Sequence, residues 1–306
     1  MKILIVCSLN SGRIVPFIVE QAESLIQAGI EVEYFTVQGK GITGYLRNYK
    51  SLRKQINKYK PDIIHAHYGL SGLLANLQRR VPVVTTYHGS DINSPKVYPI
   101  SRLCMMLSAY NIFVSEKNKQ KAGLKKKQSL IPCGVNIELF VPMDQNEAAL
   151  QMGLDTNKKN VLFAGAFNNA VKNGVLAQEA AALITDIHLI ELKGYTREQV
   201  VWLMNAVDAV LMTSHTEGSP QFIKESMACN CPIVSVPVGD VPEVINGIEG
   251  CTISTYEPTD VADKLKQALV FGKRTEGRKR IIEMGLDSET VAKKIIAAYN
   301  TVINGY

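Results

Sequence analysis

Short apolar runs recur along the first half of the chain, each bounded by turn residues and followed by a segment of helical periodicity. The segment 15–28 keeps its apolar residues on one side, and Gly29 follows where a helix C-cap residue would stand. Strands that alternate with helices predict a parallel sheet covered on both faces. The runs that predict strands are 3–7, 32–37, 63–66, 83–87, 112–114 and 129–131.

The second half repeats this order after a polar stretch at 144–159. The repeat predicts an α/β protein with two Rossmann-like, doubly wound domains and an interdomain cleft. We expect the domains to be 1–145 and 146–306, and we leave open that the C-terminal helix packs back on the N-terminal domain. The strands predicted in this half are 161–164, 187–192, 209–212, 233–236 and a short one near Cys251.

The composition is that of an ordinary globular protein. Of 306 residues, 46% are hydrophobic and 20% charged, which suits two domains and rules out long disorder. No run reaches the about 18 consecutive apolar residues of a membrane span, and the apolar start lacks a cleavage site of small residues. The six cysteines form neither a disulfide framework nor a CxxC zinc pair. We expect a mature cytoplasmic protein.

The charge balance favours anionic partners. Lysine and arginine number 34 against 28 aspartates and glutamates, and the excess is concentrated in two runs of the first half. Each run is read either as a solvated helix face or as a peripheral contact with anionic lipid head groups. No aromatic residues interleave with the cations as a stacking platform, so we expect no nucleic acid partner. The runs are Arg47, Lys50, Arg53, Lys54, Lys58 and Lys60, and Lys117, Lys119, Lys121, Lys125, Lys126 and Lys127.

The most informative stretch is 217–228, which follows a predicted strand. It reads as a turn feeding a helix, with Ser219 as N-cap and Pro220 at the first helical position. A helix start at this end of a parallel sheet binds phosphate or diphosphate through its free N–H groups. Glu217 and Glu225 flank it, and carboxylates accept hydrogen bonds from paired sugar hydroxyls. The alternative is two solvated glutamates near the positive end of a helix.

With its continuation at 231–245, this stretch resembles the retaining family-4 glycosyltransferases. Their hallmark is a Glu-Gly-x-Pro segment with a second glutamate further along the helix, then a Pro-x-Val strand and a Pro-Glu-Val-Ile helix. The resemblance implies a GT-B fold, with a nucleotide-sugar donor held mainly by the C-terminal domain and the acceptor mainly by the N-terminal one. Segments that agree in the same order are 61–67, 88–91, 114–115, 131–136, Phe140, Pro142 and 206–209.

The resemblance also implies site residues. It puts Glu225 on the ribose hydroxyls of the donor, Glu217 near the transferred sugar, and His88 facing the donor from the N-terminal domain. The loop beside the sugar is formed by Gly218, Ser219 and Pro220.

One departure from the family concerns the diphosphate. Ala166 stands where the family usually has an arginine, and Lys172 lies one residue later than the usual lysine. Lys172 is therefore the predicted diphosphate cation, and Asn168 or Asn169 supplies neutral hydrogen-bond donors. One cation stabilises a leaving diphosphate less than two. No Asp-x-Asp metal motif is present, so we expect no obligatory metal and no cofactor.

Weaker signals complete the set. Gly12, in the first strand-to-helix turn, would let backbone approach the nucleotide sugar or serve an ordinary turn, and Gly194 lies where the family's base-binding backbone passes. We expect structural roles for His65 and His67, placed on opposite faces of their strand.

A GxGxxG pattern at 39–44 is a competing signal. It does not follow the first strand, where a dinucleotide fingerprint belongs, so we expect a flexible loop rather than an oxidoreductase site.

The resemblance therefore implies a retaining glycosyltransferase that moves a hexose-type unit from a nucleotide diphosphate sugar to a hydroxyl. The expected acceptor is a saccharide or lipid-linked molecule, as in bacterial surface polysaccharide or glycolipid assembly, with possible peripheral contact at the inner membrane face. A GT-B nucleotide-sugar epimerase and a non-catalytic sugar-nucleotide-binding subunit remain alternatives.

Overall fold

The computed structural model describes residues 1–305 and separates them into two compact units. The N-terminal unit contains residues 1–134 and the final segment from Ser288, and the C-terminal unit contains Val135–Asp287. The division falls earlier than the expected boundary at 145/146, because Val135 already bridges to Asp287 and, with Phe140, joins the core of the C-terminal unit.

The N-terminal unit has a six-stranded parallel sheet. Strand β1 (Lys2–Ser8) is a nearly continuous apolar run, and such a run fits a strand buried on both faces. Ile3 and Ile5 pack with α1 (Pro16–Gln27), whereas Leu4 and Val6 pack with α3 (Tyr49–Tyr59) and α4 (Gly69–Asn76). The strand order is β2 (Glu31–Val37), β1 (Lys2–Ser8), β3 (Ile63–His67), β4 (Val83–Tyr87), β5 (Tyr110–Phe113) and β6 (Gln128–Leu130).

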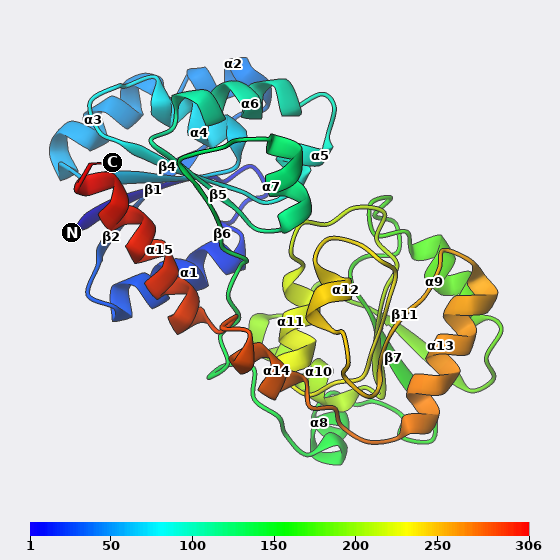
Figure 1. Ribbon diagram of the computed structural model, residues 1–306. Helices are drawn as coiled ribbons and strands as arrows, with labels where there is room; N and C mark the ends of the chain where they lie inside the picture. Colours follow the sequence, from blue (N-terminus) through cyan, green and yellow to red (C-terminus); the bar gives the residue numbers. More distant parts are fainter. Residues whose placement is uncertain (306) are drawn as a thin grey trace. The chain divides into compact units, whose positions relative to one another are not determined.

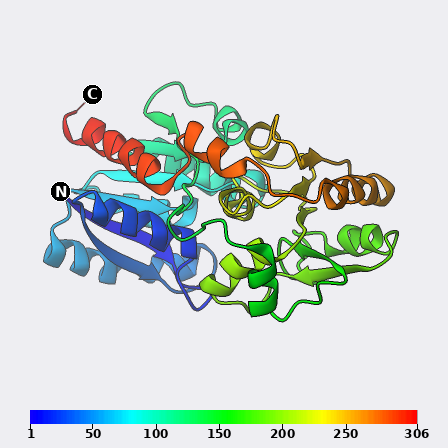
Figure 2. The same cartoon turned by 90° about the horizontal axis from the view of Figure 1, so that it is seen from below.

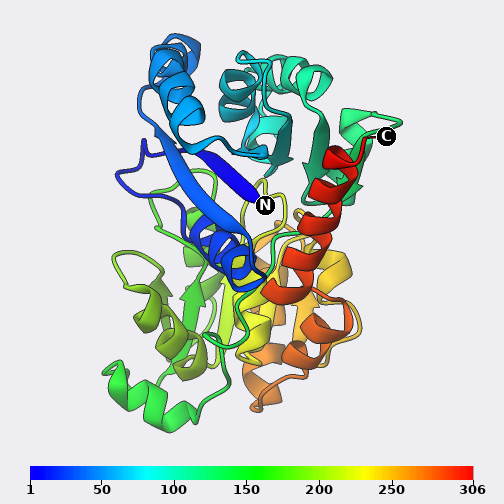
Figure 3. The same ribbon diagram turned by 90° about the vertical axis from the view of Figure 1, so that its left-hand side faces the viewer.

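The chain ends on this unit with α15 (Ser288–Ile303). Its apolar residues, among them Ile295 and Tyr299, join the same cluster as α1, and the two helices lie side by side (Figures 1 and 2). The helices α2 (Gly41–Leu46), α3 and α4 lie on the other side of the sheet (Figure 3). The remaining helices of this unit are α5 (Ser90–Asn93), α6 (Tyr98–Leu107) and α7 (Glu116–Ala122).

The glycines at 39–44 have a packing role. Residues 41–46 form α2, so the expectation of a flexible loop is wrong for this part. A Cβ on Gly44 would lie 2.7 Å from the carbonyl carbon of Gly39, so the two backbones can approach this closely only as glycines.

The C-terminal unit has a five-stranded parallel sheet. Figure 1 shows α9 (Gly174–Ala181) and α13 (Pro258–Phe271) on one of its faces and α10 (Arg197–Ala206) and α11 (Gln221–Ala228) on the other. The strand order is β11 (Cys251–Ile253), β10 (Ile233–Ser235), β9 (Ala209–Met212), β7 (Lys159–Phe163) and β8 (Ile187–Glu191). The other helices are α8 (Gln145–Gln151), α12 (Val241–Val244) and α14 (Gly277–Glu283).

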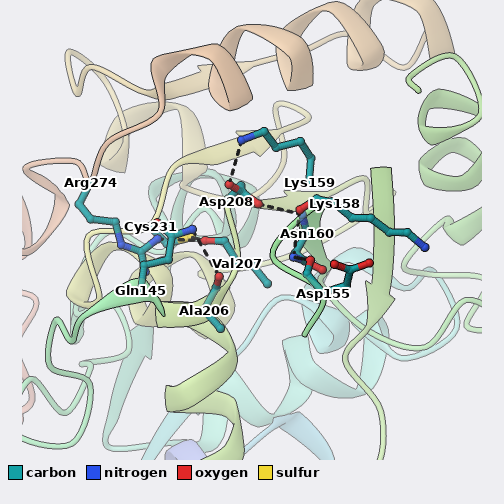
Figure 4. Close-up of polar contacts among 10 residues, drawn as sticks. All are labelled: Gln145, Asp155, Lys158, Lys159, Asn160, Ala206, Val207, Asp208, Cys231 and Arg274. Atoms are coloured by element: carbon teal, nitrogen blue, oxygen red, sulfur yellow. Dashed lines mark hydrogen bonds and ion pairs between the residues drawn. The ribbon is translucent and has the colours of Figure 1, made fainter. Parts of the chain in front are cut away.

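Polar contacts fix the start of β9 (Figure 4). Asp208 accepts a hydrogen bond from the Asn160 N–H at 2.8 Å and pairs with Lys159 at 3.5 Å. Arg274 donates to the carbonyl of Val207, and to those of Met204 and Asn205 at the end of α10. These carbonyls have no partners within the helix, so the guanidinium satisfies them. The family-like segment 206–209 therefore has a structural role here.

In residues 1–305, no helix combines the length and the apolar character needed to cross a membrane.

Candidate functional site

The loop 213–220 and helix α11 follow the carboxyl end of β9. The expected N-cap is wrong by one residue: α11 begins at Gln221, and Pro220 is the N-cap with extended backbone (φ −69°, ψ 123°). Ser219 does not cap the helix, because its hydroxyl is engaged elsewhere. The start of α11 still directs the N–H groups of its first turn toward the loop side of the sheet.

A buried polar strap holds this loop against the turn after β10. The Lys224 ammonium donates to the Ser219 hydroxyl, which donates to Asp240, and the ammonium lies 4.0 Å from the Asp240 carboxylate. Burial raises the pKa of Asp240, and Lys224 opposes this rise. Gly239 has φ +60°, and a Cβ there would lie 2.6 Å from the Gly218 carbonyl oxygen. Gly218 and Ser219 are thus fixed by contacts with β10 and α11.

Lys172 and Glu217 form an ion pair at this edge of the sheet. The Lys172 ammonium lies 2.7 Å from Glu217 Oε1, and both side chains are partly buried. Thr213 donates to the Lys172 carbonyl at 3.0 Å, which ties the β7–α9 loop to the end of β9. A Cβ on Gly165 would lie 2.9 Å from Lys172 Cγ, so the glycine leaves room for the lysine stem. Lys172 and Glu217, which were predicted as site residues from separate segments of the sequence, are therefore in contact.

Glu225 is buried beside an arginine that the sequence analysis did not identify. Arg197, the first residue of α10, pairs with Glu225 Oε1 at 2.5 Å. The guanidinium also lies over the Phe140 ring, 4.5 Å from its centroid. A carboxylate 5% exposed is costly unless paired, and Arg197 supplies its counter-charge.

Asn168 and Gly194 lie on loops after the neighbouring strands β7 and β8. Asn168 is exposed, whereas the Asn169 side chain accepts the Val171 N–H at 3.0 Å and is used in the turn. Gly194 has φ +83° and is exposed, just before the capping box of α10 at Thr196. Because the strands are parallel, these loops share one edge of the sheet with 213–220.

His88 and Gly12 belong to the N-terminal unit, after β4 and β1. Gly12 is exposed in a turn with φ +82°. The His88 ring places Nε2 3.0 Å from His67 Nδ1 and Nδ1 3.7 Å from Cys133 Sγ. The buried Asp91 accepts the His88 N–H at 3.1 Å.

The expectation that His65 and His67 point to opposite faces is wrong. Their rings stack with centroids 4.6 Å apart, because side chains two positions apart along a strand share a face. His65 Nδ1 lies 2.5 Å from the Tyr299 hydroxyl, and Nε2 lies 2.7 Å from the Thr86 hydroxyl.

Three of these residues, Lys224, Asp240 and Arg197, had no predicted role, and a fourth, His67, had only a structural one. Lys224 and Asp240 lay inside the motif segments. Lys224 could have been recognised as a lysine beside Glu225 on an otherwise apolar helix face. Arg197 lay inside the capping box and gave no separate signal. His67 was visible but was assigned a structural role.

The fold consists of two parallel α/β units, and the C-terminal unit pairs carboxylates with cations beside its loops. Sequence comparison identifies the family. Residues 31–139 match Glycosyltransferase Family 4, and residues 157–270 match Glycosyl transferases group 1. The chain belongs to this glycosyltransferase family, as the motifs indicate.

Curated relatives have low sequence identity to this chain. The D-inositol 3-phosphate glycosyltransferase of Mycolicibacterium gilvum is 25% identical over 268 residues, covering 71% of this chain and 60% of that protein. Its counterpart in Mycolicibacterium vanbaalenii is 24% identical over 277 residues, covering 71% and 61%. The chain therefore spans about 60% of the length of these relatives.

Solved structures are similar over nearly the whole chain. Sucrose-phosphate synthase of Thermosynechococcus elongatus has a TM-score of 0.85 at 17% identity, covering 99% of each chain. HepE of Anabaena, in complex with UDP-glucose, has a TM-score of 0.75 at 20% identity, covering 98% of this chain and all of that one. The predicted GT-B class of two Rossmann-like domains is confirmed.

Proposed function

We propose that the protein is a retaining glycosyltransferase that uses a nucleotide diphosphate sugar. The observation that carries the proposal is that Lys172 pairs with Glu217 in the loop before α11, while Glu225 of α11 is buried and pairs with Arg197. The HepE complex with UDP-glucose supports a nucleotide sugar as the donor substrate.

The charges fit this chemistry. When the bond between the sugar C1 and the diphosphate oxygen breaks, negative charge grows on the leaving diphosphate. In this proposal, Lys172 and the N–H groups at the start of α11 stabilise it. The new bond from C1 to the acceptor oxygen forms on the same face, and the hydroxyl proton passes to the departing phosphate. Glu225 would hold the ribose, and Glu217 would orient both Lys172 and the sugar.

No metal or cofactor enters this proposal. In residues 1–305, no three His, Cys, Asp or Glu side chains converge as metal ligands, and the charges above belong to the chain itself.

The first experiment identifies the nucleotide. Thermal-shift titrations with UDP, GDP, ADP and CDP on the wild type should show one stabilising nucleotide, since a ligand at 100 times its Kd adds about 2.7 kcal/mol. Glu225→Gln should lose most of that shift. Glu179→Gln, an exposed glutamate on α9, is the matched control and should keep it.

Transfer is measured next, with the matching nucleotide sugars. The acceptor panel includes saccharides, lipid-linked saccharides and D-inositol 3-phosphate, the compound in the relatives' name. Nuclear magnetic resonance of the product gives the anomeric configuration. Nucleotide binding without transfer would favour the non-catalytic subunit, for which Ala166 is the specific observation. Interconversion of nucleotide sugars without an acceptor would favour the epimerase.

We further propose a peripheral contact with anionic membrane, at which a lipid-linked acceptor would be presented. The residues of both basic runs are exposed except for the half-buried Lys119. Lysines near an anionic surface contribute about 1 kcal/mol each to membrane binding.

Reversing the charge of Lys125, Lys126 and Lys127 should abolish cosedimentation with phosphatidylserine vesicles at low salt. The matched control, with the same change in net charge, reverses Lys266, Lys273 and Lys279 of the C-terminal unit. Equal binding by both variants would refute the contact.

A further inference from the structure

His67 is a fully buried histidine beside His88. It has no exposed surface, and its Nδ1 lies 3.0 Å from His88 Nε2. Within residues 1–305 its other ring nitrogen, Nε2, has no hydrogen-bond partner. Burial, followed by the neighbouring His65 and His88, lowers the pKa of His67 well below its usual value. The ring is therefore neutral and carries a single N–H.

The position of that proton follows from the partners. A proton on Nε2 would bury an N–H group without an acceptor, which costs about 1–3 kcal/mol. A proton on Nδ1 is donated to His88, and only a lone pair is left unpartnered, the more tolerated state. His67 is therefore the Nδ1–H tautomer.

This tautomer determines the state of His88. Because His88 Nε2 accepts a hydrogen bond from His67, the proton of a neutral His88 is on Nδ1. Protonating Nε2 would set two N–H groups against each other across 3.0 Å, or force His67 into its unfavourable tautomer. We propose that His67 is a positioning residue that holds His88 as the neutral Nδ1–H tautomer.

The proposal specifies what His88 contributes, and in this respect it rests on the proposed function. The Nδ1–H faces Cys133 Sγ at 3.7 Å, and a thiol sulfur is a weak acceptor. A substrate oxygen can replace it at little cost. His88 then acts as a hydrogen-bond donor to substrate, and its Nε2 is not a general base.

Several other groups surround the His88 ring. Tyr68 and Phe17 lie against it, with ring centroids 4.6 Å and 4.8 Å away. Asp91 accepts the N–H groups of His88, Gly89 and Gly69, so its charge is shared among three backbone donors. Tyr68, Asp91, Cys133 and His67 are titratable side chains that contact His88 or its backbone, and His65 stacks on His67.

The test uses two variants of equal shape. In His67→Asn the side-chain amide takes the place of Nδ1–H as hydrogen-bond donor, and in His67→Leu no donor remains. The protein is labelled with ¹⁵N-histidine, and the ring nitrogens are followed by nuclear magnetic resonance from pH 5 to pH 8. His88 should be an Nδ1–H tautomer that stays neutral over this range in the wild type and in His67→Asn. In His67→Leu it should become protonated within this range.

Two outcomes would overturn the inference: an Nε2–H tautomer for His88 in the wild type, or a His88 that stays neutral in His67→Leu. The backbone amide signals of the N-terminal sheet report whether this unit is folded in each variant. If His88 is the Nδ1–H tautomer but the protein transfers no sugar, the proposed function is refuted and the positioning role of His67 still holds. If the protein transfers sugar, the pH profile of kcat/KM for His67→Leu should fall at acid pH, where its His88 becomes protonated. The profile of His67→Asn should show no such fall.

Discussion

The two units bury polar side chains in opposite ways. In the N-terminal unit, the buried histidines of β3 are neutral, because burial lowers the pKa of both His65 and His67. In the C-terminal unit, the buried groups are charged and paired: Lys224 with Asp240 and Ser219, and Glu225 with Arg197. Both sets lie beside loops at the carboxyl ends of strands.

The difference shows how each loop is held. A buried ion pair fixes geometry strongly, but losing one partner leaves an uncompensated charge. A neutral histidine cluster needs no counter-charge. It loses stability when the pH falls below about 6.5, because the unfolded chain then takes up protons that the buried histidines do not. The N-terminal unit should therefore be sensitive to acid, and the C-terminal unit to loss of a partner.

The largest effect should be the acid sensitivity of the N-terminal unit. Burial lowers the pKa of His65 from 6.5 to about 3. As the pH falls below 6.5 the unfolded chain takes up a proton that folded His65 does not, so stability is lost down to pH 3. The total is about 5 kcal/mol, or about 1.4 kcal/mol per pH unit. Amide hydrogen exchange of β3 and β4 measures it.

Asp91 must be separated from this effect because it acts with the opposite sign. Burial raises its pKa from 3.8 to about 6, so the folded unit takes up this proton first and is stabilised as the pH falls through that range. His65→Gln should reduce the slope of the unfolding free energy against pH by about 1.4 kcal/mol per pH unit. This holds whatever the stability of the variant at pH 7. An unchanged slope would show that His65 does not stay neutral in the fold.

The second effect should be the loss of a partner in the strap. Lys224→Met leaves the partly buried Asp240 without its cation, which should cost about 3 kcal/mol or less of unfolding free energy. Urea unfolding, followed by the fluorescence of Trp202, the chain's single tryptophan, reports this unit directly. Lys224→Met/Asp240→Asn is the control, and it should cost less than Lys224→Met alone.

The pH sharpens this prediction. Burial raises the pKa of Asp240, and removing Lys224 should raise it further. The penalty of Lys224→Met should therefore shrink as the pH falls and Asp240 takes up a proton. A penalty that is constant with pH, or below about 1 kcal/mol, would mean that Lys224 acts by packing alone.

The strands were largely predictable because they are buried on both faces. The apolar runs at 83–87 and 209–212 match β4 (Val83–Tyr87) and β9 (Ala209–Met212) in both bounds. The first residue of α11 was missed because Ser219 could serve either as a cap or in a tertiary hydrogen bond, and sequence does not show which partner wins. The pairing of Arg197 with Glu225 depends on how α10 and α11 pack, so no local pattern predicts it.

The domain division was missed for a similar reason. A polar stretch at 144–159 marks a change in composition, but the chain joins the second core earlier, through Val135 and Phe140. Apolar residues in a short connecting segment belong to whichever core they reach. The apolar residues of α15 likewise pack in the N-terminal unit, an arrangement that the sequence analysis had left open.

The smallest stability effect should come from the third charged pair, Lys172 with Glu217. Their side chains are 24% and 18% exposed, so the pair should stabilise the fold by about 1 kcal/mol or less. If Lys172 instead stabilises a leaving diphosphate, Lys172→Met should lower kcat about 100-fold or more. Trp202 unfolding and turnover of the nucleotide sugar, measured on the same preparation, separate the two roles. Lys172→Arg keeps the charge and should retain more activity. A stability loss as large as that of Lys224→Met would instead place Lys172 with the residues that hold the loop.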